Sequence, residues 1–168
     1  MSKYQGKVAV TSRSFSKHSG LRKELLKRYP QTKFNDSGKS LSGKDLVDFL
    51  SGYEKAITAL ETLDGSILKQ LPQLQVVGKY GVGLDMIDLQ AMSDLGIKLG
   101  WTAGVNCRGA AELTLSLMIA SLRKLTLCQK EIFAGRYQQI RGRGLTGRTV
   151  GIIGCGHIGK DLVRLLKP

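Results

Sequence analysis

The sequence TVGIIGCGHIGKDLVRLLKP, residues 149–168, contains a β-branched apolar run, a glycine-rich turn and an amphipathic helical pattern. Gly154, Gly156 and Gly159 satisfy the pattern GxGxxG, and the turn follows a run typical of a buried strand over residues 149–153. The first glycine permits a tight turn, the second lets the backbone approach a pyrophosphate, and the third lets the helix pack closely. The phosphates would meet unpaired N–H groups at the positive end of the helix dipole. The stretch predicts a dinucleotide-binding β-α unit, although such a turn can also serve packing alone.

The choice of dinucleotide is left open by the sequence. A carboxylate about 20 residues further on would indicate NAD through the ribose hydroxyl, and that position lies beyond Pro168. The glycine turn alone therefore does not separate NAD from NADP.

The composition is that of a soluble globular protein, with 42% hydrophobic and 23% charged residues among 168. The longest apolar stretch, residues 113–122, is interrupted by hydroxyl residues and is too short and polar to span a bilayer. The N-terminus lacks the pattern of a secretory signal, so we expect a cytoplasmic protein. The cysteines Cys107, Cys128 and Cys155 are widely spaced, which predicts free thiols and neither a disulfide framework nor a metal site.

The formal net charge of +13 is the unusual feature of the composition. Residues 1–44 carry eleven Lys or Arg against Glu24 and Asp36, and residues 123–148 carry seven against Glu131. Neither region is a continuous basic run, and aromatic side chains are not interleaved as base stacking would require. A solvated face is therefore favoured over a nucleic-acid interface.

Strand and helix patterns alternate through the first hundred residues. Strands are expected at residues 7–11, 32–35, 55–60 and 75–79, and helices at residues 21–29, 44–50, 64–71 and 88–95. This alternation predicts an α/β fold with a mostly parallel sheet covered on both faces.

The alternation of short strand and helix patterns ends near Arg108. A single long helix is expected over about residues 110–134, ending at Gly135, and its apolar positions extend most of the way around. We interpret this helix as a connector between domains. The glycine- and arginine-rich residues 135–147 are expected to form a surface loop.

Three segments in order, KYGVGLDMIDLQAM (79–92), GVNCRGAAELTLSLMIASLRKL (104–125) and LTGRTVGIIGCGHIG (145–159), resemble the D-2-hydroxyacid dehydrogenase family, particularly its phosphoglycerate dehydrogenase branch. The resemblance implies a flavodoxin-like substrate domain over residues 1–100. Residues 101–168 would begin a Rossmann NAD-binding domain and include the long connecting helix. The implied activity is hydride transfer between a nicotinamide and a 2-hydroxy or 2-keto acid.

The resemblance also implies the roles of particular residues. The backbone around Tyr80, Gly81, Val82 and Gly83 would bind the substrate carboxylate, with Val82 also near the nicotinamide. Asn106 matches the asparagine at the substrate cleft. Gly154, Gly156, His157, Ile158 and Gly159 match the residues that bind the cofactor.

No catalytic residue is assigned by the resemblance, because the arginine, glutamate and histidine that act in the family lie in its second half. His157 lies in the glycine turn and His18 beside a helix start, so neither is interpreted as the general acid or base. The chain resembles the first half of such an enzyme, and we expect it to be inactive alone and to form a homodimer through the long helix. The alternative is a non-catalytic, nucleotide- or partner-binding dehydrogenase-like module.

Two departures from the family pattern bear on the substrate. Trp101 and Ala103 stand where relatives commonly have an asparagine and a proline, which could reshape one side of the cleft. Thr58, Ala59 and Leu60 lie where the phosphoglycerate branch offers a basic residue to the substrate phosphate. A phosphorylated substrate is therefore not supported by the sequence.

Overall fold

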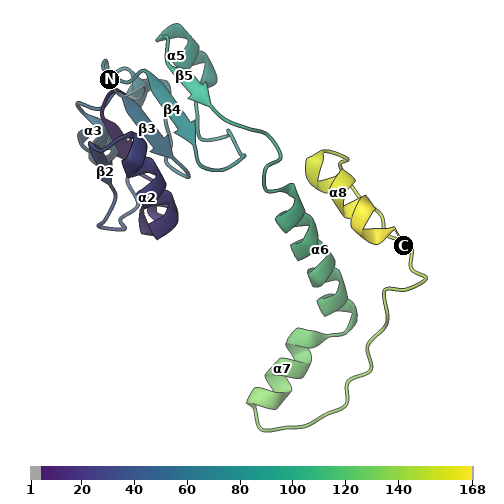
Figure 1. Ribbon diagram of the computed structural model, residues 1–168. Coiled ribbons are helices and arrows are strands. Elements are labelled where there is room, and N and C mark those ends of the chain that lie inside the picture. The colour runs from purple at the N-terminus through teal and green to yellow at the C-terminus, as the bar shows by residue number, and fades with distance from the viewer. Residues whose placement is uncertain (1–4, 168) are drawn as a thin grey trace. The chain divides into compact units, whose positions relative to one another are not determined.

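The computed structural model describes residues 5–167, and the chain divides into a first unit ending at Ala103 and a second unit beginning at Gly104 (Figure 1). The boundary expected from the sequence was between residues 100 and 101. The first unit contains β1 (Val8–Val10), α1 (Arg13–Lys17), α2 (Ser19–Arg28), β2 (Thr32–Phe34), α3 (Gly43–Leu50), β3 (Lys55–Thr58), α4 (Gly65–Leu68), β4 (Val76–Lys79), α5 (Leu89–Asp94) and β5 (Lys98–Gly100). The second unit contains α6 (Cys107–Leu122), α7 (Leu125–Phe133) and α8 (His157–Leu166).

The strands of the first unit form a five-stranded parallel sheet in the order β2-β1-β3-β4-β5. This order is the flavodoxin-like one, in which the chain first winds to one side of β1 and then to the other. In register, Val8 lies opposite both Thr32 and Lys55. The prediction of an α/β fold with a parallel sheet is confirmed.

Each face of this sheet buries its own apolar cluster, because successive side chains of a strand point to opposite faces. Ala9 and Val77 belong to one cluster, together with Leu46 and Leu50 of α3 and further residues of α4 and α5. Val8 and Val10 belong to the other, which Phe15 and Phe34 complete and against which part of α2 packs. The sheet is thus covered on both faces, as the alternation predicts.

The single helix predicted over residues 110–134 is wrong, because two helices occupy this region. Lys124 separates α6 from α7 and adopts a left-handed conformation with φ of 54°. The carbonyl oxygen of Leu122 accepts a hydrogen bond from the N–H of Arg143 at 2.9 Å, so the loop after α7 caps the end of α6. The second helix does end as expected, with Gly135 at φ of 71°.

The strand predicted over residues 149–153 is also absent; these residues are irregular, and the Ile153 side chain is fully exposed. A strand is stabilised by hydrogen bonds to a neighbouring strand, and none of the described residues 104–167 forms one. The helix predicted to follow the glycine turn is confirmed as α8.

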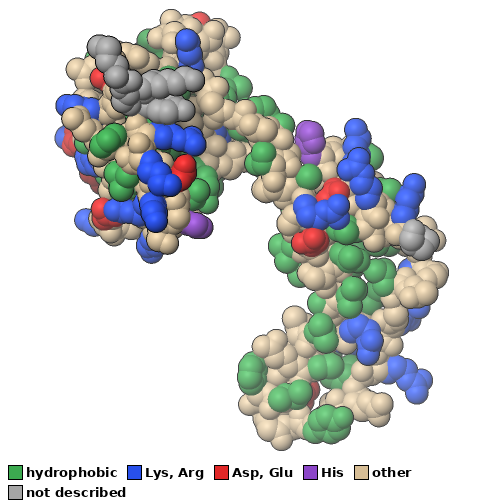
Figure 2. All heavy atoms as spheres, in the orientation of Figure 1, with side chains coloured by type: hydrophobic (Ala, Val, Ile, Leu, Met, Phe, Trp, Pro, Cys, Tyr) green, Lys and Arg blue, Asp and Glu red, His purple; other side chains and the backbone are tan. Residues whose placement is uncertain are grey.

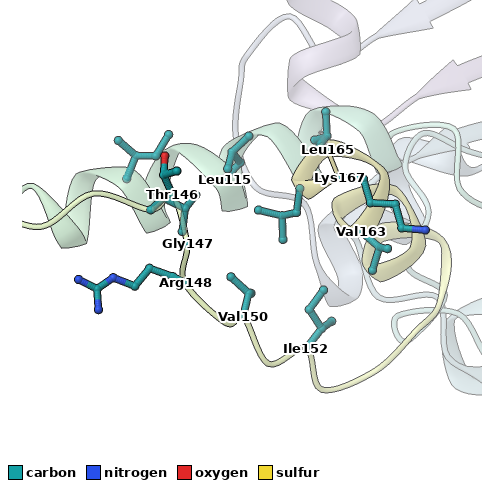
Figure 3. Close-up of a pocket in the computed structure, with 12 residues that line it drawn as sticks. Leu115, Thr146, Gly147, Arg148, Val150, Ile152, Val163, Leu165 and Lys167 are labelled. Atoms are coloured by element: carbon teal, nitrogen blue, oxygen red, sulfur yellow. The ribbon is translucent and has the colours of Figure 1, made fainter.

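A largely apolar cavity of about 760 Å³ lies within the second unit (Figure 3). Leu115 of α6, Val163 of α8, and Val150 and Ile152 of the irregular segment line it. In a Rossmann unit such helices pack on a sheet, and here their apolar side chains border a cavity instead. Among residues 5–167, no helix has the length and apolar character needed to cross a membrane.

Candidate functional site: a glycine turn and an anion-binding loop

The three glycines of the turn before α8 occupy three different environments. Gly154 has φ of 91°, which a residue with a side chain rarely adopts. A Cβ on Gly159 would lie 2.4 Å from the carbonyl oxygen of Gly154, so the helix reaches the turn only with glycine there. A Cβ on Gly156 would meet no atom within 4 Å, so its side faces open space. These are the geometries expected for the tight turn, the close helix packing and the phosphate approach.

The N-terminus of α8 offers unpaired donors beside Gly156. Gly156 is the N-cap residue, and no side chain caps the helix. The N–H of Lys160 is the first to bond within the helix, to the carbonyl of Gly156 at 3.0 Å. The N–H groups of His157, Ile158 and Gly159 are therefore available to an anion at the positive end of the helix dipole. This arrangement can hold the pyrophosphate of a dinucleotide.

The GVN segment contacts this same turn. Gly104 has φ of 70°, and a Cβ there would lie 2.8 Å from the Cγ of His157. Asn106 is the N-cap residue of α6, yet its side chain makes no capping hydrogen bond and it is exposed. The Asn106 amide is thus free to bind a ligand. The segment that carries Asn106 also packs against the His157 ring through Gly104.

The loop at the carboxyl end of β4 has the features of an anion-binding loop. The N–H of Tyr80 donates to the carbonyl of Thr58 at 2.7 Å, which ties the start of the loop to β3. Gly81 has φ of 137°, so only glycine fits this turn well. Among the described residues, the N–H groups of Gly81, Val82 and Gly83 find no hydrogen-bond acceptor. Successive free N–H groups of this kind can receive a carboxylate without a titrating side chain.

Trp101 fixes the same loop from the other side. Its indole Nε1–H donates to the carbonyl of Val82 at 3.0 Å. The Tyr80 ring packs edge-on against Phe15 of α1, with ring centroids 5.3 Å apart. The first contact uses a backbone carbonyl and the second a side-chain ring, so neither occupies the N–H groups of residues 81–83.

Each of the two histidines lies at the start of a helix. The Nδ1 atom of His18 accepts from the N–H of Leu21 at 3.2 Å and caps α2, as expected for a residue beside a helix start. His157 opens α8 against Gly104. Within residues 5–167, no group of three or more His, Cys, Asp or Glu residues could hold a metal ion.

The predicted site residues therefore form two groups. Tyr80, Gly81, Val82 and Gly83 form one continuous loop in the first unit. Asn106 belongs to the second unit, where the contact between Gly104 and His157 brings its segment to the glycine turn.

Sequence reasoning missed two features of this surface. It noted Trp101 only as a departure from the family pattern, and the hydrogen bond to Val82 spans too many residues for a local pattern to reveal. It also gave no role to Arg13 and Lys17, which line a cavity at the carboxyl edge of the sheet. The available signal was their position directly after the first strand, where ligands of parallel α/β sheets bind.

Comparison with known proteins places this fold and these loops in one family of dehydrogenases. The profile described as "D-isomer specific 2-hydroxyacid dehydrogenase, catalytic domain" matches residues 8–157. The chain belongs to this family.

Particular relatives give the same assignment. The chain is 33% identical to a glyoxylate reductase/hydroxypyruvate reductase of Homo sapiens over 140 residues, covering 79% of this chain and 43% of the relative. It is 28% identical to a D-3-phosphoglycerate dehydrogenase of Archaeoglobus fulgidus over 130 residues, covering 76% of this chain and 25% of the relative. A crystal structure titled as a D-isomer specific 2-hydroxyacid dehydrogenase, NAD-binding, from Polaromonas superposes with a TM-score of 0.86 at 26% identity. That match covers 95% of this chain and 51% of the solved one. The chain therefore spans about half the length of the solved protein and less than half the length of these two relatives.

Proposed function

We propose that this chain supplies the substrate-binding and first cofactor-binding elements of an NAD-dependent D-2-hydroxyacid dehydrogenase. The observation that carries the proposal is the glycine turn, where Gly154 and Gly159 have geometries that demand glycine while Gly156 faces open space beside an uncapped helix. Gly154, Gly156, His157, Ile158 and Gly159 would hold the pyrophosphate. NAD supplies the hydride acceptor when bound, and NADP stays an alternative.

The substrate in this proposal is a small 2-hydroxy or 2-keto acid. Its carboxylate would bind the free N–H groups of Gly81, Val82 and Gly83 and be oriented by Tyr80 and Asn106. Backbone donors suit this task, because they keep their charge distribution at every pH. In this proposal Val82 would also contact the nicotinamide.

Hydride transfer to or from an alcohol also needs a group that moves a proton. The only histidines of the chain are His18 and His157, one capping α2 and the other set against Gly104. We therefore propose that the 168-residue chain binds dinucleotide without turning over substrate. This behaviour is shared with the alternative of a non-catalytic binding module.

A pair of glycine variants tests the cofactor site. Gly156→Ala has room for its Cβ and φ of −78°, so the fold tolerates it while the new methyl group occupies the phosphate approach. Gly109→Ala in α6, which also has open space around it, is the matched control. In calorimetric titrations with NADH, Gly156→Ala should weaken binding about tenfold or more, since each lost hydrogen bond to a charged group is worth about 1.5–3 kcal/mol. Equal affinities of the wild type and Gly156→Ala would contradict the proposal.

We further propose a cytoplasmic homodimer that associates through α6 and α7. Figure 2 shows hydrophobic side chains on the surface of this part of the second unit. Phe133 is 81% exposed, and Leu117 and Leu125 are more than half exposed. Contiguous exposed apolar surface is typical of protein interfaces. Sedimentation should show a dimer for the wild type and a shift to monomer for Phe133→Glu, and a monodisperse wild-type monomer would contradict the proposal.

A further inference from the structure

A second cavity, of about 410 Å³, opens at the carboxyl edge of the first unit's sheet. The segments that follow β1, β2 and β3 line it. They contribute Ser12, Arg13 and Lys17 at the start and along α1, Ser40 after β2, and Ala59 and Glu61 after β3. In the strand order β2-β1-β3, the chain reverses its winding direction at β1. Parallel α/β sheets bind ligands at this reversal point, outside the carboxyl ends of the strands.

A buried hydrogen-bond network holds the walls of the cavity in place. Asn35, which is 1% exposed, donates through Nδ2 to the carbonyls of Thr11 at 2.8 Å and Lys39 at 2.9 Å. The hydroxyl of Ser16 accepts from the N–H of Asn35 at 3.1 Å. These bonds join the loop after β1 to the loop after β2, so the lining side chains stand on a fixed backbone.

The cavity lining carries an excess of positive charge. Arg13 and Lys17 lie one helical turn apart in α1, and within residues 5–167 neither has a carboxylate partner. The Lys17 ammonium lies against Gly38, 3.8 Å from the point a Cβ there would occupy. Glu61 is 7% exposed, and its carboxylate is bonded to the N–H of Ala59 at 2.7 Å. The two cations are therefore exposed to a ligand, while the one acid is turned to the backbone.

The cavity is connected to the anion-binding loop by direct contacts. Phe15 of α1 packs on the Tyr80 ring, and the carbonyl of Thr58 accepts from the N–H of Tyr80. The ammonium of Lys79 donates to the carbonyl of Ala59, which lines the cavity. Strands β1 and β4 are two strand spacings apart in the sheet, which is roughly 10 Å.

We propose that Arg13 and Lys17 form a second anion subsite, which receives a phosphate or carboxylate at the far end of the 2-hydroxy acid. This proposal rests on the proposed function, since the first carboxylate would bind at residues 81–83. The loop after β3 lacks a basic residue, and helix α1, which follows β1, supplies two instead. The subsite selects acids with two anionic groups over glyoxylate-sized acids with one.

Titration of the 168-residue chain with inorganic phosphate, followed by NMR, tests the subsite without a dinucleotide or a reaction. We expect saturable shifts at residues 12–17, 38–40 and 59–61. A parallel titration with malonate distinguishes a phosphate from a carboxylate preference. Saturable shifts at these residues with either anion support the subsite, and shifts spread evenly over the basic surface or confined to residues 156–159 would overturn it.

A charge-matched pair of double variants completes the test. Arg13→Gln/Lys17→Gln should weaken the binding of the preferred anion roughly tenfold. The control Lys23→Gln/Lys69→Gln removes the same charge from exposed residues outside the cavity and should bind as the wild type does. Equal weakening in both double variants would show general charge attraction and overturn the proposal. NADH affinity, measured on the same variants, reports the proposed cofactor site separately, so the two failures can be told apart.

Discussion

The two units of the chain bury their apolar residues very differently. Among the described residues, the buried apolar side chains lie almost entirely between Val8 and Ile97, and only Ala111 and Leu162 are buried in the second unit. The first unit folds its strands into a complete sheet with a cluster on each face. The second unit has helices of comparable length that border an apolar cavity. An amphipathic element therefore buries its apolar face only where the surface on which it packs is present.

The same contrast holds at the helix starts. In the first unit, side chains of Ser12, His18, Asp64 and Asp88 accept hydrogen bonds from the helices that they precede. In the second unit, none of the three described helices has a side-chain cap. Four of the five described helices of the first unit are thus capped by a side chain, α3 being the exception, and the uncapped start of α8 leaves its donors to a ligand.

The largest expected effect is on the free energy of unfolding, and it tests the difference in packing between the two units. Leu46→Ala removes a fully buried side chain of α3 and should lower the free energy of unfolding by roughly 2–5 kcal/mol. Leu117→Ala, at a side chain that is 59% exposed in α6, should change it by about 0.5 kcal/mol or less. Urea titration followed by far-ultraviolet circular dichroism reports both units, because each unit contains helices. A cost for Leu117→Ala as large as that for Leu46→Ala would break the comparison.

The next effect concerns the second unit alone, where an ion pair joins α6 to α8. The Nε of Arg108 lies 3.1 Å from Oδ2 of Asp161, whose side chain is 5% exposed, and Arg164 is more distant at 3.7 Å. Arg108→Ala should destabilise the packing of α8 by about 1–3 kcal/mol, because a buried carboxylate loses its nearest cation. Hydrogen exchange of α8 amides should accelerate while that of β1, β3 and β4 is unchanged. Arg141→Ala in the exposed loop is the control, and equal protection of α8 in both variants would contradict the prediction.

A smaller effect compares the two ligand loops. Trp101→Phe keeps the ring and removes the hydrogen bond to the carbonyl of Val82, a loss of about 1 kcal/mol. The amide signals of residues 81–83 should shift and exchange faster with solvent, while those of the glycine turn at residues 154–159 stay unchanged. Unaltered signals at residues 81–83 would show that the loop does not depend on Trp101.

The sequence predicts well those features that residues close together in the chain determine. The strands and helices of the first unit follow local periodicity, and the glycine turn follows from three glycines with separate steric tasks. At the break near Lys124 the carbonyl of Leu122 bonds to the distant N–H of Arg143, and the strand expected over residues 149–153 would need a neighbouring strand. The support of Val82 by Trp101 and the cavity beside Arg13 likewise arise from tertiary contacts. Periodicity cannot show them, because it describes one segment at a time.

The smallest expected effect tests the contrast in helix capping through its pH dependence. The Asp64 carboxylate accepts hydrogen bonds from the Ser66 hydroxyl at 2.6 Å and from the N–H groups of Ser66 and Ile67 at 2.9 and 3.0 Å. These bonds, that from the Ser66 hydroxyl above all, lower the pKa of Asp64 below its ordinary value of 3.8. Because the pKa is lower in the folded chain, the stabilisation by Asp64 is present above the unfolded value and is lost as the pH falls through the folded one. Asp64→Ala should therefore lower the thermal midpoint of the first unit at pH 7, and the difference from the wild type should shrink below about pH 4. A difference that stays constant down to pH 2 would show that the cap acts through packing and not through its charge.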